Sequence, residues 1–315
     1  MTPPKRVLVS GSIAYDTIMV FDGHFKDHIL PDRTHMLSVS FLAPRLKREF
    51  GGTAANIAFN LAMLGGAPAL LATVGRDGQE YLDRLSGFGV DVGAVRLLPE
   101  HWTAQCFITT DLADNQIIAF HPGAMAEAHA VHVSDALPAD LGIVSPNGKQ
   151  AMLDHAAQFA QAGVRWIFDP GQGLPMFDGD ELRALIGRST AVAVNDYESA
   201  MLAQRTGWDE ARIAGELDAF IVTRGAEGST VWQHGRPHEV AAVSIEAAVD
   251  PTGCGDAYRA GLLHGLSLGL DWVDSARVGS VMGAIKIEHP GAQNHRTSAE
   301  DVALRHEAAF GHRPW

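Results

Sequence analysis

The 315-residue sequence predicts an α/β protein with a mostly parallel central sheet, helices on both faces of that sheet, and a small β-sheet lid. Short apolar runs that end in polar residues alternate with helical segments, which implies right-handed crossovers between parallel strands. Two stretches in the N-terminal half interrupt this alternation with strand and loop patterns. They predict a second, smaller sheet.

The chain opens with a pattern typical of such a domain. Residues 6–12 form an apolar run that ends in a glycine turn, as expected of a first buried strand. Residues 17–50 lack helical periodicity, so we expect short antiparallel strands and loops there. Residues 53–64 follow Gly51-Gly52, are rich in helix formers and end at Gly65-Gly66, which predicts a helix with a glycine stop.

A hairpin follows the next strand and helix. Residues 69–74 predict a strand and residues 79–88 a helix. Residues 103–110 and 116–120 flank the turn at 112–115 and predict a hairpin. The hairpin can join the irregular N-terminal stretch in a sheet that stands off the main body.

We therefore expect one domain over residues 1–315, with a lid formed from about 15–50 and 103–122. The second half continues with four further strands, at 141–145, 166–169, 191–195 and 219–223. Ligands of parallel sheets collect at the carboxyl ends of the strands. Asp169, Asn195 and Thr223 all fall at such ends.

Composition limits the classes of partner. A formal net charge of −13 argues against non-specific binding to nucleic acid, which needs a basic surface. It leaves ATP open, because amide dipoles and a metal can attract phosphate locally. The two cysteines, Cys106 and Cys254, suggest neither a disulfide scaffold nor a zinc site, so we expect a cytoplasmic protein. The spacing of the fifteen histidines matches no zinc signature. No apolar run reaches the roughly 18 residues of a membrane span.

The strongest motif is the glycine-rich turn at residues 250–256, Asp-Pro-Thr-Gly-Cys-Gly-Asp, which leads into an apolar helix. Gly253 and Gly255 let successive amides point into one concavity, and a helix start adds partial positive charge that holds phosphate. Asp256 at the rim of this anion site suits a base that takes a proton from an attacking hydroxyl. A helix cap is the alternative role for Asp256.

This motif resembles the signature of ribokinase-like (PfkB) carbohydrate and nucleoside kinases, usually Asp-Thr-x-Gly-Ala-Gly-Asp. The sequence differs by a proline after the first aspartate and by Cys254 in place of alanine; a redox role for that thiol is the alternative to simple replacement. The resemblance implies that Asp256 is the catalytic base. It also implies that the amides of Gly253, Cys254 and Gly255 stabilise the transferring phosphoryl group.

Two further matches concern the acceptor. The segment 11–16, Gly-Ser-Ile-Ala-Tyr-Asp, resembles the family's first strand turn, in which Asp16 would bind sugar hydroxyls. Gly51, Gly52 and Asn56 resemble the diglycine motif that approaches the sugar. A carboxylate and an amide together would recognise a vicinal diol and align the remaining hydroxyl. A turn residue and a polar residue in a first helical turn are the alternatives.

Two further matches concern the nucleotide. Asn195 and Glu198 resemble the family's element that organises magnesium and its waters. The turn 222–228 and the late segment 283–293 resemble the parts that bind ATP, and the residues concerned are Thr223, Arg224, Gly225, Gly228 and Gln293. Oxygen ligands held partly through water suit Mg²⁺. Asn195 and Glu198 also have the spacing of a helix capping box. Family members often use a monovalent cation such as K⁺ near the anion loop, and the sequence leaves this open.

The sequence gives less direct evidence for the identity of the molecule that accepts the phosphoryl group. Ala14 stands where sugar kinases commonly have asparagine, and the segment 169–172, Asp-Pro-Gly-Gln, resembles bacterial adenosine kinases, in which Gln172 would lie near the nucleobase. Phe107 and Phe120 of the hairpin can stack on a base or pack the lid.

We therefore expect ATP-dependent phosphorylation of the 5′-hydroxyl of adenosine, inosine or a similar nucleoside, in purine salvage, by a monomer or homodimer. A ribokinase or fructokinase is the alternative of the same class, and a non-catalytic sugar or nucleoside sensor is the alternative of another class. A dinucleotide-dependent oxidoreductase is disfavoured, because the first glycine turn lacks Gly-x-Gly-x-x-Gly.

Overall fold

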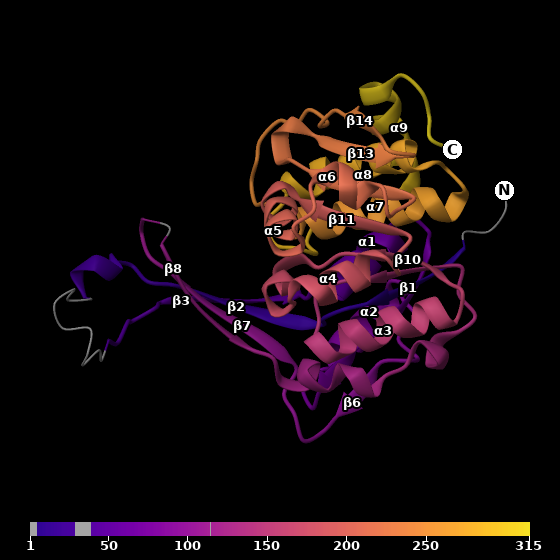
Figure 1. The fold of residues 1–315 in the computed structure, drawn as a ribbon. Helices are drawn as coiled ribbons and strands as arrows, with labels where there is room; N and C mark the ends of the chain where they lie inside the picture. The colour runs from indigo at the N-terminus through magenta and orange to yellow at the C-terminus, as the bar shows by residue number, and fades with distance from the viewer. Residues whose placement is uncertain (1–4, 29–38, 114) are drawn as a thin grey trace.

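The computed structural model describes residues 5–28, 39–113 and 115–315 (Figure 1). Residues 29–38 of the predicted lid and Asp114 of the predicted turn lie outside the described residues. The remaining lid strands project from the body of the molecule as a long arm (Figure 1).

The body is built around an eight-stranded sheet. Its order is β14-β13-β12-β11-β10-β9-β1-β4, and the run from β12 to β4 is parallel whereas β13 and β14 are antiparallel. The bounds are β1 Arg6–Ser10, β4 Ala67–Leu71, β9 Leu141–Val144, β10 Arg165–Phe168, β11 Ala191–Asn195, β12 Ala219–Thr223, β13 Ser229–Gln233 and β14 Arg236–Val240. The predicted mostly parallel sheet is confirmed.

Helices cover both faces of this sheet, because its central strands are apolar on both sides. Val7 and Val9 pack on one face and Leu8 on the other. The first face carries α1 Thr53–Met63, α2 Gln79–Gly87 and α7 Cys254–Leu268, with α8 Trp272–Ile287 and α9 Ala299–Phe310 packed beside them. The second face carries α3 Lys149–Gln161, α4 Gly179–Ile186, α5 Asp196–Thr206 and α6 Glu210–Ala214.

The arm is the predicted lid. Its four strands have the order β3-β2-β7-β8, with bounds β2 Ala14–Val20, β3 Arg45–Gly51, β7 Ala104–Thr110 and β8 Gln116–His121. Every residue of β8 is exposed, whereas the segments beyond β2 and before β3 pack Phe21, Phe25 and Phe41 against one another, with ring centroids 4.9 to 6.0 Å apart. β2 follows β1 after only three residues, and Gly52 alone separates β3 from α1. The lid is thereby joined to the body at the carboxyl end of β1.

One predicted strand is wrong in extent. The pattern at 69–74 predicts a single strand, whereas β4 of the main sheet ends at Leu71. Thr73–Gly75 forms β5, which pairs instead with β6, Arg96–Leu98. The Thr73 hydroxyl donates a hydrogen bond to the Ala124 carbonyl at 2.6 Å, outside the main sheet. Apolar periodicity cannot reveal this change of partner, because both halves are buried.

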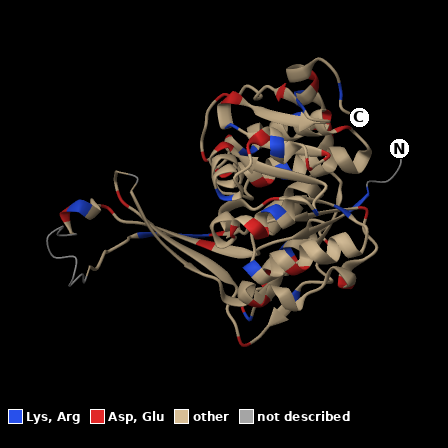
Figure 2. Ribbon diagram, in the orientation of Figure 1, with Lys and Arg blue, Asp and Glu red and all other residues tan. Residues whose placement is uncertain are grey.

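In the ribbon of Figure 2, the positions of lysine and arginine alternate with those of aspartate and glutamate over the whole body of the molecule. Among the described residues, no helix combines the length and the apolar character needed to cross a bilayer.

Candidate active site

The first turn of α7 is an open anion site. Its N-cap is Gly253, whose φ of 78° is left-handed, and no side chain caps the helix. A Cβ at Gly253 would lie 2.9 Å from the Cβ of Ala292, so the position favours glycine on two grounds. Helical geometry leaves the amides of Gly255 and Asp256 without intrahelical acceptors. They are free to bind an anion.

Asp256 stands in this first turn and is partly exposed. Its Oδ2 accepts a hydrogen bond from Asn56 Nδ2 at 2.8 Å. Burial raises the pKa of Asp256 to about 7; the Asn56 bond opposes that rise, and the charges of Asp169 and Asp16 add to it. The group is therefore poised to accept a proton near neutral pH.

Asn56 is itself held by a buried network. Its Oδ1 accepts a hydrogen bond from Gln293 Nε2 at 2.9 Å. Gln293 Nε2 also lies 2.5 Å from the Tyr81 hydroxyl, which donates to the Gly51 carbonyl at 2.7 Å. The prediction that Gln293 binds ATP needs correction, since this buried side chain is directed to Asn56. The sequence analysis did not predict that Tyr81 belongs to this network, because a tyrosine in an amphipathic helix is typical of a hydrophobic core.

The acceptor motifs meet at the base of the lid. A Cβ at Gly51 would lie 2.3 Å from Asp16 Oδ2, and one at Gly52, with φ of 89°, would lie 2.5 Å from the Ala14 nitrogen. Both glycines therefore permit close approach of the backbone. Burial, followed by the charge of Glu49, raises the pKa of Asp16 to about 6.

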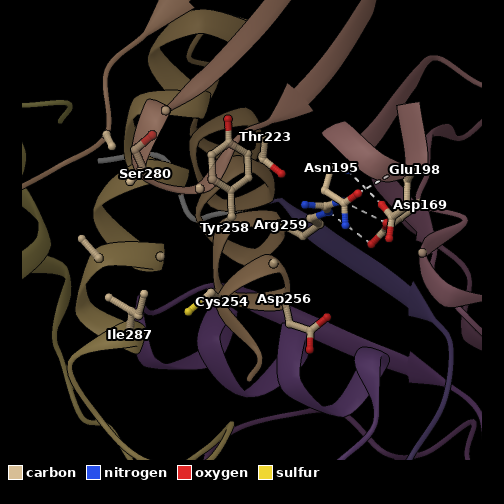
Figure 3. A pocket seen from close by; sticks show the side chains of 18 of the residues that line it. Asp169, Asn195, Glu198, Thr223, Cys254, Asp256, Tyr258, Arg259, Ser280 and Ile287 are labelled. Atoms are coloured by element: carbon tan, nitrogen blue, oxygen red, sulfur yellow. Dashed lines mark hydrogen bonds and ion pairs between the residues drawn. The ribbon is translucent and has the colours of Figure 1, made fainter. Parts of the chain in front are cut away.

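A cavity of about 480 Å³ extends from Asp256 along the carboxyl ends of the sheet (Figure 3). Its polar end includes Gln172, Asn195 and Glu198. Its other end is mostly apolar and is formed by Ala242, Val243, Ile245, Ala248, Ala284 and Ile287. A cavity with polar residues beside α5 and α7 and apolar residues beside α8 suits a nucleotide with its phosphates directed toward α7.

Arg259, one turn after Asp256, was missed by the sequence analysis. Its guanidinium donates to both carboxylate oxygens of Asp169 at 3.2 and 3.1 Å and to the Ala193 carbonyl at 3.1 Å. Both side chains are almost fully buried. Figure 3 shows Arg259 reaching from α7 toward Asp169, Asn195 and Glu198. These bonds join α7 to Asp169, which follows β10, and to β11.

Asn195 and Glu198 form the capping box that the sequence left as an alternative. Asn195 Oδ1 accepts from the Glu198 amide at 2.7 Å, and Glu198 Oε2 accepts from the Asn195 amide at 2.9 Å. Burial, then the charge of Asp169, raises the pKa of Glu198. In the described part of the chain, no three acidic, histidine or cysteine side chains are placed so that they could hold a metal ion together. A magnesium ion here would need ligands from phosphate and water, which suits Mg²⁺.

Only some residues of the turn predicted to bind ATP line the cavity. Thr223, Gly225 and Gly228 line the cavity. A Cβ at Gly228 would lie 2.2 Å from the Val240 carbonyl oxygen. The Arg224 side chain does not line the cavity: its guanidinium lies 3.7 Å from a Glu210 carboxylate oxygen and is bonded to the Thr230 hydroxyl. Its predicted contact with ATP is therefore not formed in this arrangement.

Residues 6–299 match the family described as pfkB family carbohydrate kinase. The chain belongs to this family. A nucleoside kinase of Methanothermobacter thermautotrophicus is 28% identical over 323 residues, covering 100% of this chain and 99% of its own.

Two solved structures of Burkholderia thailandensis nucleoside kinase are also similar. The complex with inosine is 47% identical, with a TM-score of 0.88, and the match covers 98% of this chain and 99% of the other. The complex with ADP-inosine is 49% identical, with a TM-score of 0.86, covering 98% and 97%.

The lid of this pfkB-family chain separates the two predicted aromatic residues. Cys106 pairs with both Asp16 and Phe120, so these three side chains share one face of the lid sheet. Phe107 is one residue further and pairs with Ala119 on the opposite face. Phe107 therefore needs correction as a substrate contact, whereas Phe120 lies on the face of Asp16.

Proposed function

We propose that this protein transfers the γ-phosphoryl group of ATP to the 5′-hydroxyl of a ribonucleoside such as inosine or adenosine. The observation that carries this proposal is Asp256, a carboxyl group with pKa near 7 at the open head of α7 and hydrogen-bonded to Asn56. An anion site and a proton acceptor at one place are what phosphoryl transfer to a hydroxyl requires.

In this proposal Asp256 accepts the proton of the 5′-hydroxyl as its oxygen bonds to the γ-phosphorus. The bond from that phosphorus to the bridging oxygen breaks, and ADP leaves with the electron pair. The amides of Gly253, Gly255 and Asp256 stabilise the charge on the moving phosphoryl group. The predicted contribution of the Cys254 amide needs correction, because this amide donates to the Pro251 carbonyl at 3.1 Å. Asp16, Gly52 and Asn56 hold the ribose, and lid closure excludes water.

Asn195 and Glu198 are the residues that would hold Mg²⁺, through water, beside the phosphates. When bound, the ion neutralises charge on ATP. The Glu198 carboxyl group lines the cavity and keeps one oxygen outside the capping box, which supports this assignment.

A nucleoside acceptor is favoured over a free sugar by several observations. The similar Burkholderia protein is named a nucleoside kinase and binds inosine. Gln172 lines the cavity, and its segment 169–172 resembles that of bacterial adenosine kinases. Ala14 supplies no polar side chain toward the sugar. Purine salvage in the cytoplasm is the role consistent with this acceptor.

A substrate panel tests the proposal. ADP release is measured with ATP, Mg²⁺ and, in parallel, inosine, adenosine, ribose or fructose. We expect kcat/KM for a nucleoside to exceed that for either sugar by about 10²-fold or more. A preference for ribose or fructose would make the protein a sugar kinase. Saturable nucleoside binding by calorimetry without ADP release would make it a sensor.

A further inference from the structure

A buried lysine lies beside the anion loop. Lys286 occupies the last turn of α8 and its side chain has no exposed surface. Its Nζ donates to the Asp250 carbonyl at 2.7 Å and to the His289 carbonyl at 2.9 Å. Both acceptors are main-chain oxygens. A buried charge is costly unless it is well bonded, so an ammonium here needs a reason beyond packing.

The two carbonyls belong to the segments that shape the anion site. Asp250 starts the glycine-rich loop, and its carboxylate accepts from the amides of Thr252 at 2.8 Å and Gly291 at 2.7 Å. The Ile287 carbonyl accepts from the amides of Val249 and Asp250 at 2.8 and 3.1 Å. The Lys286 ammonium therefore lies where the loop, the end of α8 and the segment leading to Gly291 meet.

The segment after His289 supports the loop directly. Ala292 is the residue that a Cβ at Gly253 would touch, so its position sets the space available to the helix head. By bonding to the carbonyls of Asp250 and His289, Lys286 joins the two sides of this contact. It does not line the ATP cavity, although the adjacent Ile287 does. Lys286 is thus suited to position the loop without touching substrate.

Convergent main-chain carbonyls are also the ligands that a dehydrated K⁺ ion prefers. Here an ammonium of the chain itself supplies the positive charge at that point. Burial lowers the pKa of Lys286, while electrostatic interactions with Cys254 and Asp250 oppose the decrease. Burial likewise raises the pKa of Asp250, but the amides of Thr252 and Gly291, with the Lys286 charge, bring it below its usual value. The pair is electrostatically matched.

We propose that the Lys286 ammonium is the resident cation of the phosphate-binding loop and replaces a monovalent metal ion there. The kinase should accordingly need Mg²⁺ but neither K⁺ nor Na⁺. Lys286 acts as a positioning residue: its charge balances the Asp250 carboxylate, and its two bonds hold the loop that presents the α7 amides. This inference rests on the proposed kinase activity for its kinetic test but not for its stability test.

The first experiment uses the unmodified protein. Activity with inosine, ATP and Mg²⁺ is measured in potassium, sodium or choline chloride at equal ionic strength, with choline salts of all reagents. We expect kcat to agree within about twofold across the three salts. Activation by K⁺ of about tenfold or more over choline would overturn the proposal, whatever the variants do.

The second experiment removes the ammonium in two ways. Lys286→Met keeps the length of the side chain without charge, and Lys286→Ala leaves space beside the two carbonyls. We expect kcat of Lys286→Met to fall roughly tenfold to 10²-fold in every salt, with KM for inosine changed less than about threefold, because the loop amides act on the transition state. Lys286→Ala should recover activity in potassium or ammonium chloride and not in choline chloride.

Thermal unfolding gives a readout that is independent of activity. The melting temperature of Lys286→Ala should be several degrees higher in potassium chloride than in choline chloride, whereas the unmodified protein should show no difference beyond about one degree. Met282→Ala, one turn earlier in α8 and equally buried, is the matched control. It also opens a cavity but keeps the ammonium, so it should lose stability equally in all salts.

These outcomes separate the two proposals. A protein that phosphorylates no nucleoside but shows K⁺ stabilisation only as Lys286→Ala disproves the kinase proposal and supports the cation replacement. A Lys286→Met variant with normal kcat overturns the replacement. If neither variant folds, Lys286→Arg keeps the charge, and its independence of K⁺ together with that of the unmodified protein decides the matter.

Discussion

The N-terminal ends of α5 and α7, here called their heads, differ in the hydrogen bonds that their first backbone amides make. At α5, Asn195 and Glu198 bond to each other's amides, so the helix closes its own N-terminus. At α7, Gly253 supplies no side chain, and the first-turn Asp256 bonds to Asn56 instead of a helix amide. Both heads border the same cavity. One helix presents carboxyl and amide oxygens, whereas the other presents N–H groups.

The difference assigns opposite ligands to the two ends. An uncapped helix N-terminus attracts an anion, and a capped one with an acidic side chain attracts a cation and its waters. ATP with Mg²⁺ carries both kinds of group, so the two heads together can orient it. The stability that a cap would add to α7 is given up for binding, as is common at functional sites.

The largest expected effect comes from Asp256→Asn. It removes the proton acceptor but keeps an oxygen for the Asn56 bond, so kcat should fall about 10²-fold or more. The folded-state pKa of Asp256, about 7, lies above the ordinary 3.8, so the folded protein loses stability as the pH rises from about 4 to about 7. The variant should therefore melt at a higher temperature than the unmodified protein at pH 8, with the difference vanishing near pH 4.

Asp180→Asn is a suitable control for that experiment, since Asp180 lies in the first turn of α4 and is 93% exposed. Activity should be unchanged, and its effect on melting should not depend on pH in the same way. An Asp256→Asn variant with kcat within a few-fold of normal would remove the role of general base.

The pH dependence should follow from the same carboxyl group. Asp256 acts only as the carboxylate, so kcat/KM for inosine should be level above about pH 7 and fall about tenfold per unit below it. Asn56→Ala removes the hydrogen bond that lowers this pKa, and should move the falling limb to higher pH. A limb centred near pH 4 would show that burial does not raise the pKa of Asp256 in solution.

A smaller effect is expected when the open head of α7 is disturbed. Gly253→Ala places a methyl group 2.9 Å from Ala292 at a left-handed φ, so the loop must shift and kcat should fall roughly tenfold. Gly269→Ala at the other end of α7 is the control, because its φ is 90° but nothing lies within 4 Å of its Cβ. It should cost similar backbone strain, about 1 kcal/mol, and leave kcat unchanged.

The sequence predicted the strands and helices that carry these heads because periodicity and glycine stops are local signals. Residues 191–195 and 219–223 match β11 and β12 in full. The candidate site was predictable only where a motif marks it. Gln293 and Arg259 depend on contacts across 237 and 90 residues, which no local pattern encodes. Phe107 and Phe120 were grouped together because lid register, which sets the face of each side chain, was unknown.

The smallest expected effect concerns the closed head of α5. Asn195→Ala removes one half of the capping box and should cost about 1 kcal/mol of unfolding free energy, measured by urea titration. Asp178→Ala removes the equivalent cap of α4, which is not part of the cavity lining, and should cost a similar amount.

Only the α5 variant should also raise the Mg²⁺ concentration needed for half-maximal activity, by a few-fold, because Asn195 loses the side-chain oxygen that is proposed to help hold the waters of the ion. Equal magnesium dependence in the two variants would mean that the α5 cap is structural alone. The two heads would then differ in their hydrogen bonding but not in the ligands they hold, and magnesium would be bound by ATP and water without help from Asn195.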